Sequence, residues 1–176
     1  MKLVIMGPIG SGKGTQAKIL AEKYSLVHLS TGDIMRSHIN NKTEIGMQIK
    51  SILDSGGYVD DELTTELLKS SLTEKFILDG YPRRVSQVAL LASLTEVDKV
   101  IFLEVDEAEV IERIALRYAE TNREDDKPEI IKKRLEIFKE ETLPIIEIYE
   151  KEGKLIKIPG FGNVDDVTER IVKALL

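Results

Sequence analysis

Short apolar runs alternate along the chain with longer segments in which apolar side chains recur every three or four positions. The short runs span residues 2–6, 26–29, 76–78, 99–105 and 155–158, and several are apolar at nearly every position. Such runs are typical of parallel strands covered on both faces. Helical periodicity marks residues 14–24, 33–40, 44–53, 62–72, 85–94, 107–117, 128–150 and 164–176. The alternation predicts an α/β fold in which helices flank a five-stranded parallel sheet.

Two segments interrupt this alternation. Residues 30–75 are far more than one crossover helix needs, and they hold three helical patterns separated by "NKT" and "DSGGYVDD". We therefore expect an inserted helical subdomain there. The polar stretch "RYAETNREDDK", residues 117–127, has no periodicity and predicts a surface loop that acts as a lid.

Composition narrows the class of protein. The 176 residues suit one compact domain, and 42% hydrophobic with 32% charged residues is ordinary for a globular enzyme. Because 25 basic residues face 31 acidic ones, no overall positive field favours nucleic acid as a partner. The chain has no cysteine, which excludes disulfides and a cysteine-ligated zinc site. No stretch has the length of a membrane span or the pattern of a secretion signal, so we expect a cytoplasmic protein.

The segment "GPIGSGKGTQ", residues 7–16, follows the first apolar run and precedes a helical pattern. Glycines there let backbone N–H groups turn toward an anion at a helix N-terminus, and Lys13 adds a positive charge. Gly14 stands where the usual phosphate loop has a hydroxyl, which follows at Thr15. A phosphate site is favoured over a ligand-free glycine-rich turn. The nearest match to a GTPase base-reading motif, "NKTE" at residues 41–44, has the wrong acid, which argues against a switch protein.

The segment "FILDGYPRRVSQ", residues 76–87, places an acid at the carboxyl end of a buried strand. That end faces the crevice where open α/β sheets bind ligands, so Asp79 can hold Mg²⁺ through water, or else cap the next segment. Gly80 and Pro82 predict a tight turn, and the planar guanidinium of Arg83 suits a phosphate.

Together "GPIGSGKGTQ", "LSTGDIMR", "LDGYPRRVSQ" and the arginines of the lid resemble the adenylate kinases, within the nucleoside monophosphate kinases, from residue 1 to about residue 160. The family's loop reads Gly-Lys-Gly-Thr, which accounts for Gly14. The resemblance implies a P-loop NTPase fold and transfer from MgATP to AMP, giving two ADP. It implies one kinase domain: a core of residues 1–30, 60–112 and 135–176, a monophosphate-binding insert at about 31–59, and a lid of the short kind, without zinc, at about 113–134. We expect a monomer.

The resemblance also implies an AMP site. Its members are Thr31, Arg36, Gly57, Tyr58, Val59, Gly80, Arg83, Gln87, Arg123 and Arg134. Uridylate and cytidylate kinases usually have alanine and asparagine where this chain has Thr31 and Gln87, so both positions favour adenine. An amide can offer a donor and an acceptor to the adenine edge. Other interpretations stay open: "STGD" is also a capping box, and Gln87 can be a solvated helix residue.

The ATP site implied by the same resemblance comprises Gly10, Ser11, Gly12, Lys13, Gly14, Thr15, Arg113, Arg117 and Gly160, with Thr15 and Asp79 as the metal site. Arg113 would stack on the ATP base. The catalytic set would be Lys13, Arg83, Arg117, Arg123 and Arg134, which would neutralise the phosphates. Taken singly, surface arginines are often solvated or paired with acids such as Glu112, Glu120 and Asp125.

The acceptor phosphate is already ionised, so no general base is required, and His28 and His38 are interpreted as structural. Water is a competing acceptor, from which we expect the lid and the insert to close over both nucleotides before transfer.

Several positions depart from the family pattern. The lid reads "NREDD", with Asn122 and Glu124 in place of the usual glycine and valine. Asp125 and Asp126 match the family's lid acids, although Asp126 with Glu129 can also form a helix cap. Asp60 replaces a frequent proline, and Arg84 a small polar residue. Two other functions remain as alternatives: a pyrimidine (UMP or CMP) kinase, and an ATP-dependent binding or assembly factor without fast turnover.

Overall fold

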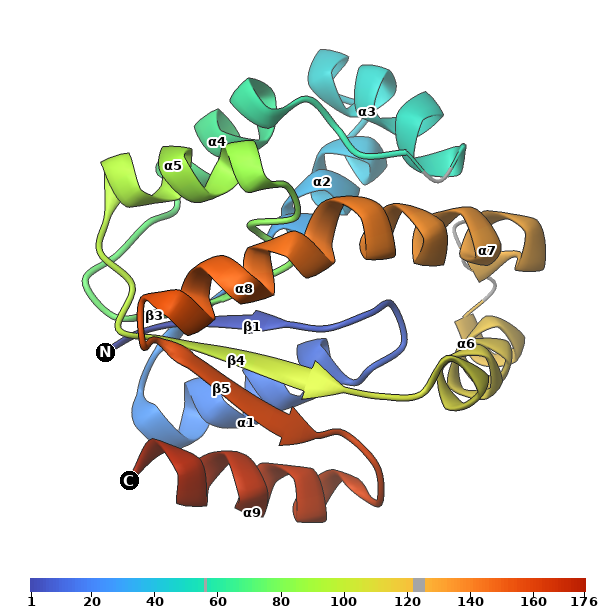
Figure 1. Ribbon diagram of the computed structural model, residues 1–176. Helices are drawn as coiled ribbons and strands as arrows, with labels where there is room; N and C mark the ends of the chain where they lie inside the picture. The colour runs from blue at the N-terminus through green and yellow to red at the C-terminus, as the bar shows by residue number, and fades with distance from the viewer. Residues whose placement is uncertain (56, 122–125) are drawn as a thin grey trace.

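A five-stranded parallel sheet forms the centre of the molecule (Figure 1). The computed structural model describes residues 1–55, 57–121 and 126–176. Its strands are β1 (Lys2–Met6), β2 (Val27–Ser30), β3 (Phe76–Asp79), β4 (Lys99–Glu104) and β5 (Leu155–Pro159). They lie in the order β2-β3-β1-β4-β5, and every neighbouring pair is parallel. The predicted fold class and all five predicted strands are confirmed, within one or two residues at their ends.

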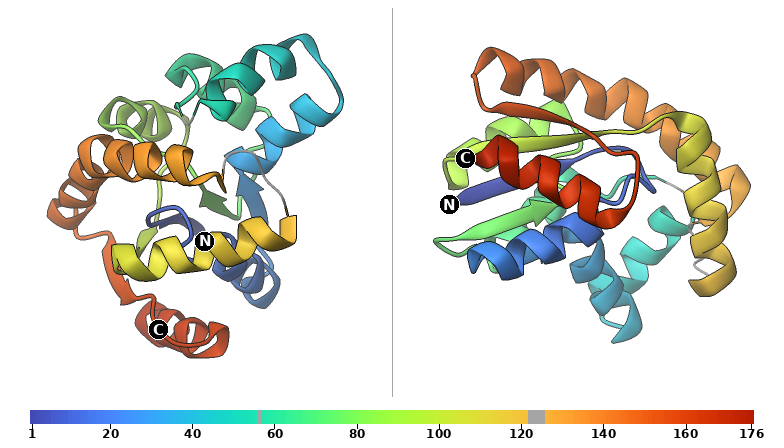
Figure 2. Two further views of the ribbon diagram at one scale, coloured as in Figure 1. Left: turned by 90° about the vertical axis from the view of Figure 1, so that its right-hand side faces the viewer. Right: turned by 90° about the horizontal axis from the view of Figure 1, so that it is seen from below.

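Side chains of β1 alternate between two apolar layers. Leu3 and Ile5 point to the face that α1 (Lys13–Tyr24) and α9 (Val164–Leu175) cover. Val4 and Met6 point to the opposite face, under α5 (Val85–Leu94) and α8 (Leu143–Lys151). Both layers are visible in Figure 2, where α1 and α9 lie side by side beneath the sheet. Since a strand side chain points to alternate faces, only a strand covered on both sides reads as continuously apolar.

The expected helical insert lies between β2 and β3. It consists of α2 (Thr31–Asn40), α3 (Glu44–Asp54) and α4 (Asp61–Lys69). The insert has an apolar cluster of its own around Met35, Ile49 and Val59, to which α4 contributes Leu63 and Leu67. The packing therefore continues beyond residue 59, into α4.

The first turns of the insert helices have local caps. The Ser30 hydroxyl accepts a hydrogen bond from the Asp33 amide at the start of α2. Asp60 caps α4, because its carboxylate accepts from the amides of Glu62 and Leu63. The aspartate that replaces a frequent proline at position 60 thus supplies the hydrogen bonds that the helix start needs.

The predicted helix 128–150 is a continuous helical segment with a wide turn in it. It comprises α7 (Pro128–Ile137), a π-helical turn (Phe138–Thr142) and α8. Pro144 has no N–H to donate to the carbonyl four residues earlier, which explains why the regular ladder is interrupted here. Helix α6 (Glu107–Thr121) precedes this segment and lies beyond the carboxyl ends of the strands (Figure 1).

None of the helices in the described part of the chain combines the length and apolar character needed to cross a bilayer.

Candidate active site

The loop between β1 and α1 has the backbone of an anion-binding turn. Gly10 and Gly12 have φ angles of 77° and 90°, in the left-handed region that glycine adopts without strain. A Cβ on Gly10 would lie 2.7 Å from a side-chain carbon of Ile114 in α6, so packing as well as φ requires glycine there. Gly12 is the N-cap of α1 and has no side chain over the helix end. The first amides of α1 therefore face an open space at the positive end of the helix dipole.

Lys13, the first residue of α1, is partly buried beside this loop. Its ammonium donates a hydrogen bond to the Pro8 carbonyl at 3.1 Å. Burial lowers the Lys13 pKa to about 8, the nearby Asp79 opposes that shift, and Arg83, Arg134 and Arg117 add to it. An anion bound here would offset the repulsion between Lys13 and the neighbouring guanidinium groups, so anion binding is favoured at this position.

Asp79 ends β3 directly opposite the loop. Its Oδ2 lies 3.8 Å from His28 Nε2, and its buried Oδ1 has no hydrogen-bond partner among the described residues. Burial raises the Asp79 pKa, but His28, Lys13 and Arg83 outweigh it, so that the pKa lies below its usual value. A Cβ at Gly14 would stand 3.3 Å from Asp79 Oδ2, so glycine at this position keeps the approach to the carboxylate open.

These groups fit a divalent cation bound together with a phosphate. Thr15 lines the same cleft as Asp79 and Gly14. Mg²⁺ typically takes one or two protein oxygens and keeps waters and substrate phosphates as its other ligands. The described residues contain no cluster of three or more acidic, histidine or cysteine side chains that would hold a metal alone. A cation held by Asp79 and Thr15 would take its other ligands from water and phosphate oxygens.

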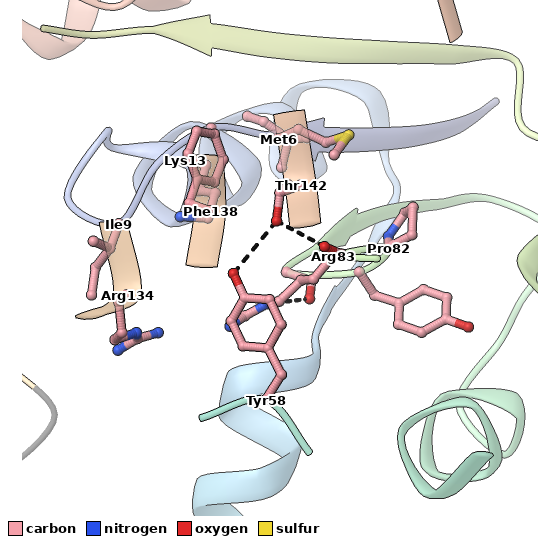
Figure 3. A pocket seen from close by; sticks show the side chains of 13 residues that line it. Met6, Ile9, Lys13, Tyr58, Pro82, Arg83, Arg134, Phe138 and Thr142 are labelled. Carbon is pink, nitrogen blue, oxygen red and sulfur yellow. Dashed lines mark hydrogen bonds between the residues drawn. The ribbon is translucent and has the colours of Figure 1, made fainter. Parts of the chain in front are cut away.

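A cleft of about 520 Å³ opens above the loop, within the usual size range of ligand sites. Its cationic lining combines residues from α1, the insert, the segment after β3 and the helices α6 and α7: Lys13, Lys18, Arg36, Arg83, Arg117 and Arg134. Figure 3 shows a smaller pocket beside the cleft, which Lys13, Arg83 and Arg134 line as well. The structure thus brings together four of the five residues predicted to be catalytic. The fifth, Arg123, lies outside the described residues, as do Asn122, Glu124 and Asp125.

Helix α6 carries two of the predicted arginines. Arg117 forms a two-point contact with Asp126, with its Nε 2.8 Å from Oδ2 and its Nη2 2.5 Å from Oδ1, while it also lines the cleft. The helix-cap interpretation of Asp126 is wrong, because the N-cap of α7 is Lys127 and makes no side-chain cap bond. The Asp126 side chain is instead fully buried against Arg117, whose guanidinium it orients.

Arg113 lies against the phosphate loop. Its guanidinium donates to the carbonyls of Ser11 and Gly160, at 3.3 and 2.8 Å, and pairs with Glu109. Two segments predicted to bind ATP, the loop and the turn at Gly160, are therefore joined through this side chain. Its stacking on a base stays a prediction.

A second hollow adjoins the cleft on the side of the insert. Its lining unites Thr31, Arg36, Gly57, Tyr58, Val59, Gly80, Arg83, Gln87 and Arg134, which are the predicted AMP-site residues within the described chain. The Thr31 hydroxyl donates to the Gly80 carbonyl at 2.9 Å, which holds α2 against the end of β3. The capping role of "STGD" coexists with this position, since Ser30 makes the cap.

Gln87 is buried, only 3% exposed, so the solvated-helix interpretation of this residue is wrong. Its Oε1 accepts a hydrogen bond from the Arg83 amide at 2.7 Å, and its Nε2 donates to Asp61 Oδ1 at 2.7 Å. The amide expected to face a base is therefore already held by the protein on both of its polar atoms.

Tyr58 and Thr142 join the insert to the π-helical turn. The Tyr58 ring contacts two guanidinium groups, with its centroid 5.2 Å from Arg83 Cζ and 5.5 Å from Arg84 Cζ. Its hydroxyl is 3.4 Å from Thr142 Oγ1, which donates to the Arg83 carbonyl at 2.8 Å (Figure 3).

Sequence reasoning missed Asp61, Thr142 and the role of the Tyr58 ring. Asp61 and Thr142 belong to no recognisable motif, and the residues they contact are 26 and 59 positions away in the chain. The unusual Arg84 was the one available signal, since an extra guanidinium beside a phosphate site needs a partner. It has two, Asp61 at 3.1 Å and Glu141 at 3.9 Å.

Comparison with known proteins gives a consistent result. The family model described as "Adenylate kinase" matches residues 5–154. The adenylate kinase of Clavibacter michiganensis subsp. michiganensis is 46% identical to this chain over 99% of the chain and 92% of the relative. Adenylate kinases of Bifidobacterium longum and Stenotrophomonas maltophilia (strain K279a) are 45% and 42% identical over 99% of the chain, with 100% and 99% of their own lengths covered.

The lowered pKa of Lys13 predicts that this residue destabilises the nucleotide-free fold. The unfolded lysine keeps the proton up to pH 10.5 while the folded one loses it near pH 8. The destabilisation by the charged Lys13 therefore has its full size below about pH 8 and disappears as the pH rises toward 10.5. We expect Lys13→Met, an uncharged side chain of similar length, to raise the free energy of unfolding at pH 7 by about 1–2 kcal/mol.

Denaturant unfolding at pH 7 and at pH 10 measures this difference. The stabilisation should shrink at the higher pH. A matched control is Lys23→Met, which changes a lysine in the last turn of α1, away from the cleft. Equal effects of the two substitutions, or a loss of stability in Lys13→Met, would contradict the assigned environment of Lys13.

Proposed function

The chain belongs to the adenylate kinase family, and we propose that it reversibly transfers the terminal phosphoryl group of MgATP to AMP, giving two ADP. It is a kinase, a nucleotide-binding transferase. The observation that carries the proposal is the position of the second hollow beside the cationic cleft, with Arg36, Gly80, Arg83 and Arg134 lining both. Two phosphate-bearing ligands can then meet above Lys13.

In the proposed reaction an oxygen of the AMP phosphate attacks the terminal phosphorus of ATP. A new P–O bond forms as the bond to the bridging oxygen breaks, and the electron pair leaves on ADP. The attacking oxygen is ionised at neutral pH, so no proton has to be removed. The cleft then needs only to orient the two phosphates and to stabilise their charge. His28 and His38 need no part in a proton transfer.

Cationic side chains supply what this reaction requires. We assign Lys13, Arg83, Arg117 and Arg134, together with Arg123, to neutralise charge on the phosphates as it shifts during transfer. Asp126 orients the guanidinium of Arg117 through its two-point contact. Arg113, anchored between Ser11 and Gly160, is the proposed neighbour of the ATP base.

Asp79, through water, and Thr15 are the proposed holders of Mg²⁺, on the basis of the partnerless Asp79 Oδ1 and the open space at Gly14. When bound with ATP, the ion neutralises phosphate charge. Zinc is not expected.

We assign the acceptor base to the hollow lined by Thr31, Tyr58, Val59 and Gln87, and the acceptor phosphate to Arg36 and Arg83. Closure of the monophosphate-binding segment, about residues 31–59, and of the lid, about residues 113–134, over the core would exclude water as a competing acceptor. Contacts between the insert and α7–α8 support this, since Lys133 donates to the Ser55 carbonyl at 2.8 Å and Tyr58 approaches Thr142. We propose that the enzyme acts as a cytoplasmic monomer.

The choice of acceptor tests the proposal. With MgATP as donor, we expect AMP to be phosphorylated with a kcat/KM at least about 100-fold above those of CMP and UMP, because a badly fitting base leaves the second N–H and the second lone pair of the buried Gln87 amide unpaired. Chromatographic measurement of the nucleoside diphosphates formed gives the three values. Preference for CMP or UMP would identify a pyrimidine kinase. Tight ATP binding without transfer to any acceptor would identify an ATP-dependent binding factor.

The proposed role of Arg117 predicts a loss in rate. Arg117→Lys keeps the charge but cannot reproduce the planar two-point contact. We expect kcat to fall about 100-fold, because the lost charge positioning acts mainly in the transition state. Arg170→Lys, which changes a half-buried arginine on α9 that donates to the carbonyls of Pro159 and Phe161, is the matched control and should retain its rate. Full activity of Arg117→Lys would remove Arg117 from the catalytic set.

A further inference from the structure

Asp61, the first residue of α4, collects three hydrogen-bond donors from the segment that follows β3. Its Oδ1 accepts from Gln87 Nε2 at 2.7 Å and from Arg84 Nη1 at 3.1 Å, and its Oδ2 accepts from the Ser86 hydroxyl. Burial raises the Asp61 pKa, but the three donors outweigh it and hold the pKa below its usual value. Asp61 is therefore ionised at neutral pH, and an ionised carboxylate can only accept hydrogen bonds.

The Asp61 carboxylate determines the orientation of the Gln87 side-chain amide. The carboxylate of Asp61 has to face the NH₂ group of Gln87, since two acceptors repel each other. On the other side the Arg83 N–H donates to Oε1 at 2.7 Å, and a flipped amide would place two donors together. Among the residues that the structure describes, each amide atom keeps one unused position: Nε2 has a second N–H and Oε1 a second lone pair. Gln87 lines the hollow beside Thr31 and Val59.

We propose that Asp61 is a positioning residue for base selection, which acts by fixing the donor and acceptor atoms of Gln87 in the order that adenine requires and hypoxanthine does not. Adenine offers an acceptor at N1 and a donor at its 6-amino group. Hypoxanthine carries the reversed pair, a donor at N1 and an acceptor at O6. An amide free to flip could serve either base, whereas a locked one serves one of them. This inference rests on the proposed function insofar as the acceptor base occupies this hollow.

The cap of α4 leaves Asp61 free for this role. Asp60, not Asp61, accepts the first amides of the helix, from Glu62 and Leu63. All three donors to the Asp61 carboxylate come instead from residues 84–87. Arg84 supports the arrangement from outside, because it contacts Asp61, lies over the Tyr58 ring and reaches Glu141 at 3.9 Å.

Asp61→Asn is the test, because asparagine has the same shape but can offer an NH₂ group to a flipped Gln87. With MgATP as donor, we expect the ratio of kcat/KM for AMP to that for inosine monophosphate to fall about tenfold. The KM for AMP should rise, while kcat with AMP and the KM for ATP stay within about twofold. The matched control is Asp60→Asn on the neighbouring carboxylate. Asparagine caps a helix as well as aspartate does, so its ratio should stay unchanged.

A double-mutant cycle separates positioning through Gln87 from a purely structural effect. In a Gln87→Met background the amide is gone, so Asp61→Asn should no longer change the AMP to inosine monophosphate ratio. An undiminished effect in that background, or an unchanged ratio in Asp61→Asn alone, would overturn the inference.

Failure of the proposed function would look different, because the wild-type enzyme itself would not phosphorylate AMP.

Should Asp61→Asn not fold, NMR of the Gln87 side-chain amide in the wild-type protein tests the inference. One Nε2 proton protected from solvent exchange without nucleotide is the expected result. Two unprotected protons would overturn the inference.

Discussion

Repulsion among the positively charged side chains of one cleft is the constraint that shapes the rest of the site. Lys13 lies near the guanidinium groups of Arg83, Arg117 and Arg134, with Asp79 as the main opposing charge. Burial, together with the like charges nearby, disfavours the charged form of the lysine and lowers its pKa to about 8. A phosphate bound in this cleft would attract the cationic side chains and would also reduce their repulsion for one another. Both effects favour binding.

The protein limits this repulsion by giving individual guanidinium groups internal partners. Arg117 has the buried Asp126, Arg113 has Glu109, and Arg36 has Asp33 at 2.6 Å. These pairs hold the side chains in defined orientations in the absence of nucleotide. Preorganisation of this kind reduces the entropy that the enzyme loses when it binds its substrates. Arg36 and Arg117 can exchange or share these partners with phosphates, whose charge is larger.

The sequence predicted those parts of the molecule that local physics determines. Strands covered on both faces leave continuous apolar runs, and the glycines after the first run predicted a turn whose positive φ angles the structure confirms at Gly10 and Gly12. Asp79 was found because a strand end faces the crevice. By contrast, the hydrogen bonds of Gln87 with Asp61 and Arg83, and the pairing of Arg117 with Asp126, depend on which of several available partners lies nearest after folding. Composition and spacing contain no signal for that choice, so both interpretations of Asp126 stayed open, and the helix cap was the wrong one.

The π-helical turn shows how a local irregularity connects the two halves of the site. Pro144 prevents the regular hydrogen bond, and within the resulting wide turn the Thr142 hydroxyl reaches the Arg83 carbonyl and the Tyr58 hydroxyl. Arg83 is held from its other side by Gly80, whose carbonyl accepts from Arg83 Nε at 2.7 Å. The residue that lines both the cleft and the base hollow is thus fixed through its backbone by α7–α8 and through its side chain by the end of β3. A shift of the insert that moved Tyr58 would change the cation–π contacts of Arg83 and Arg84 together, so the position of the insert and the orientation of Arg83, the arginine proposed for the acceptor phosphate, are coupled by direct contact.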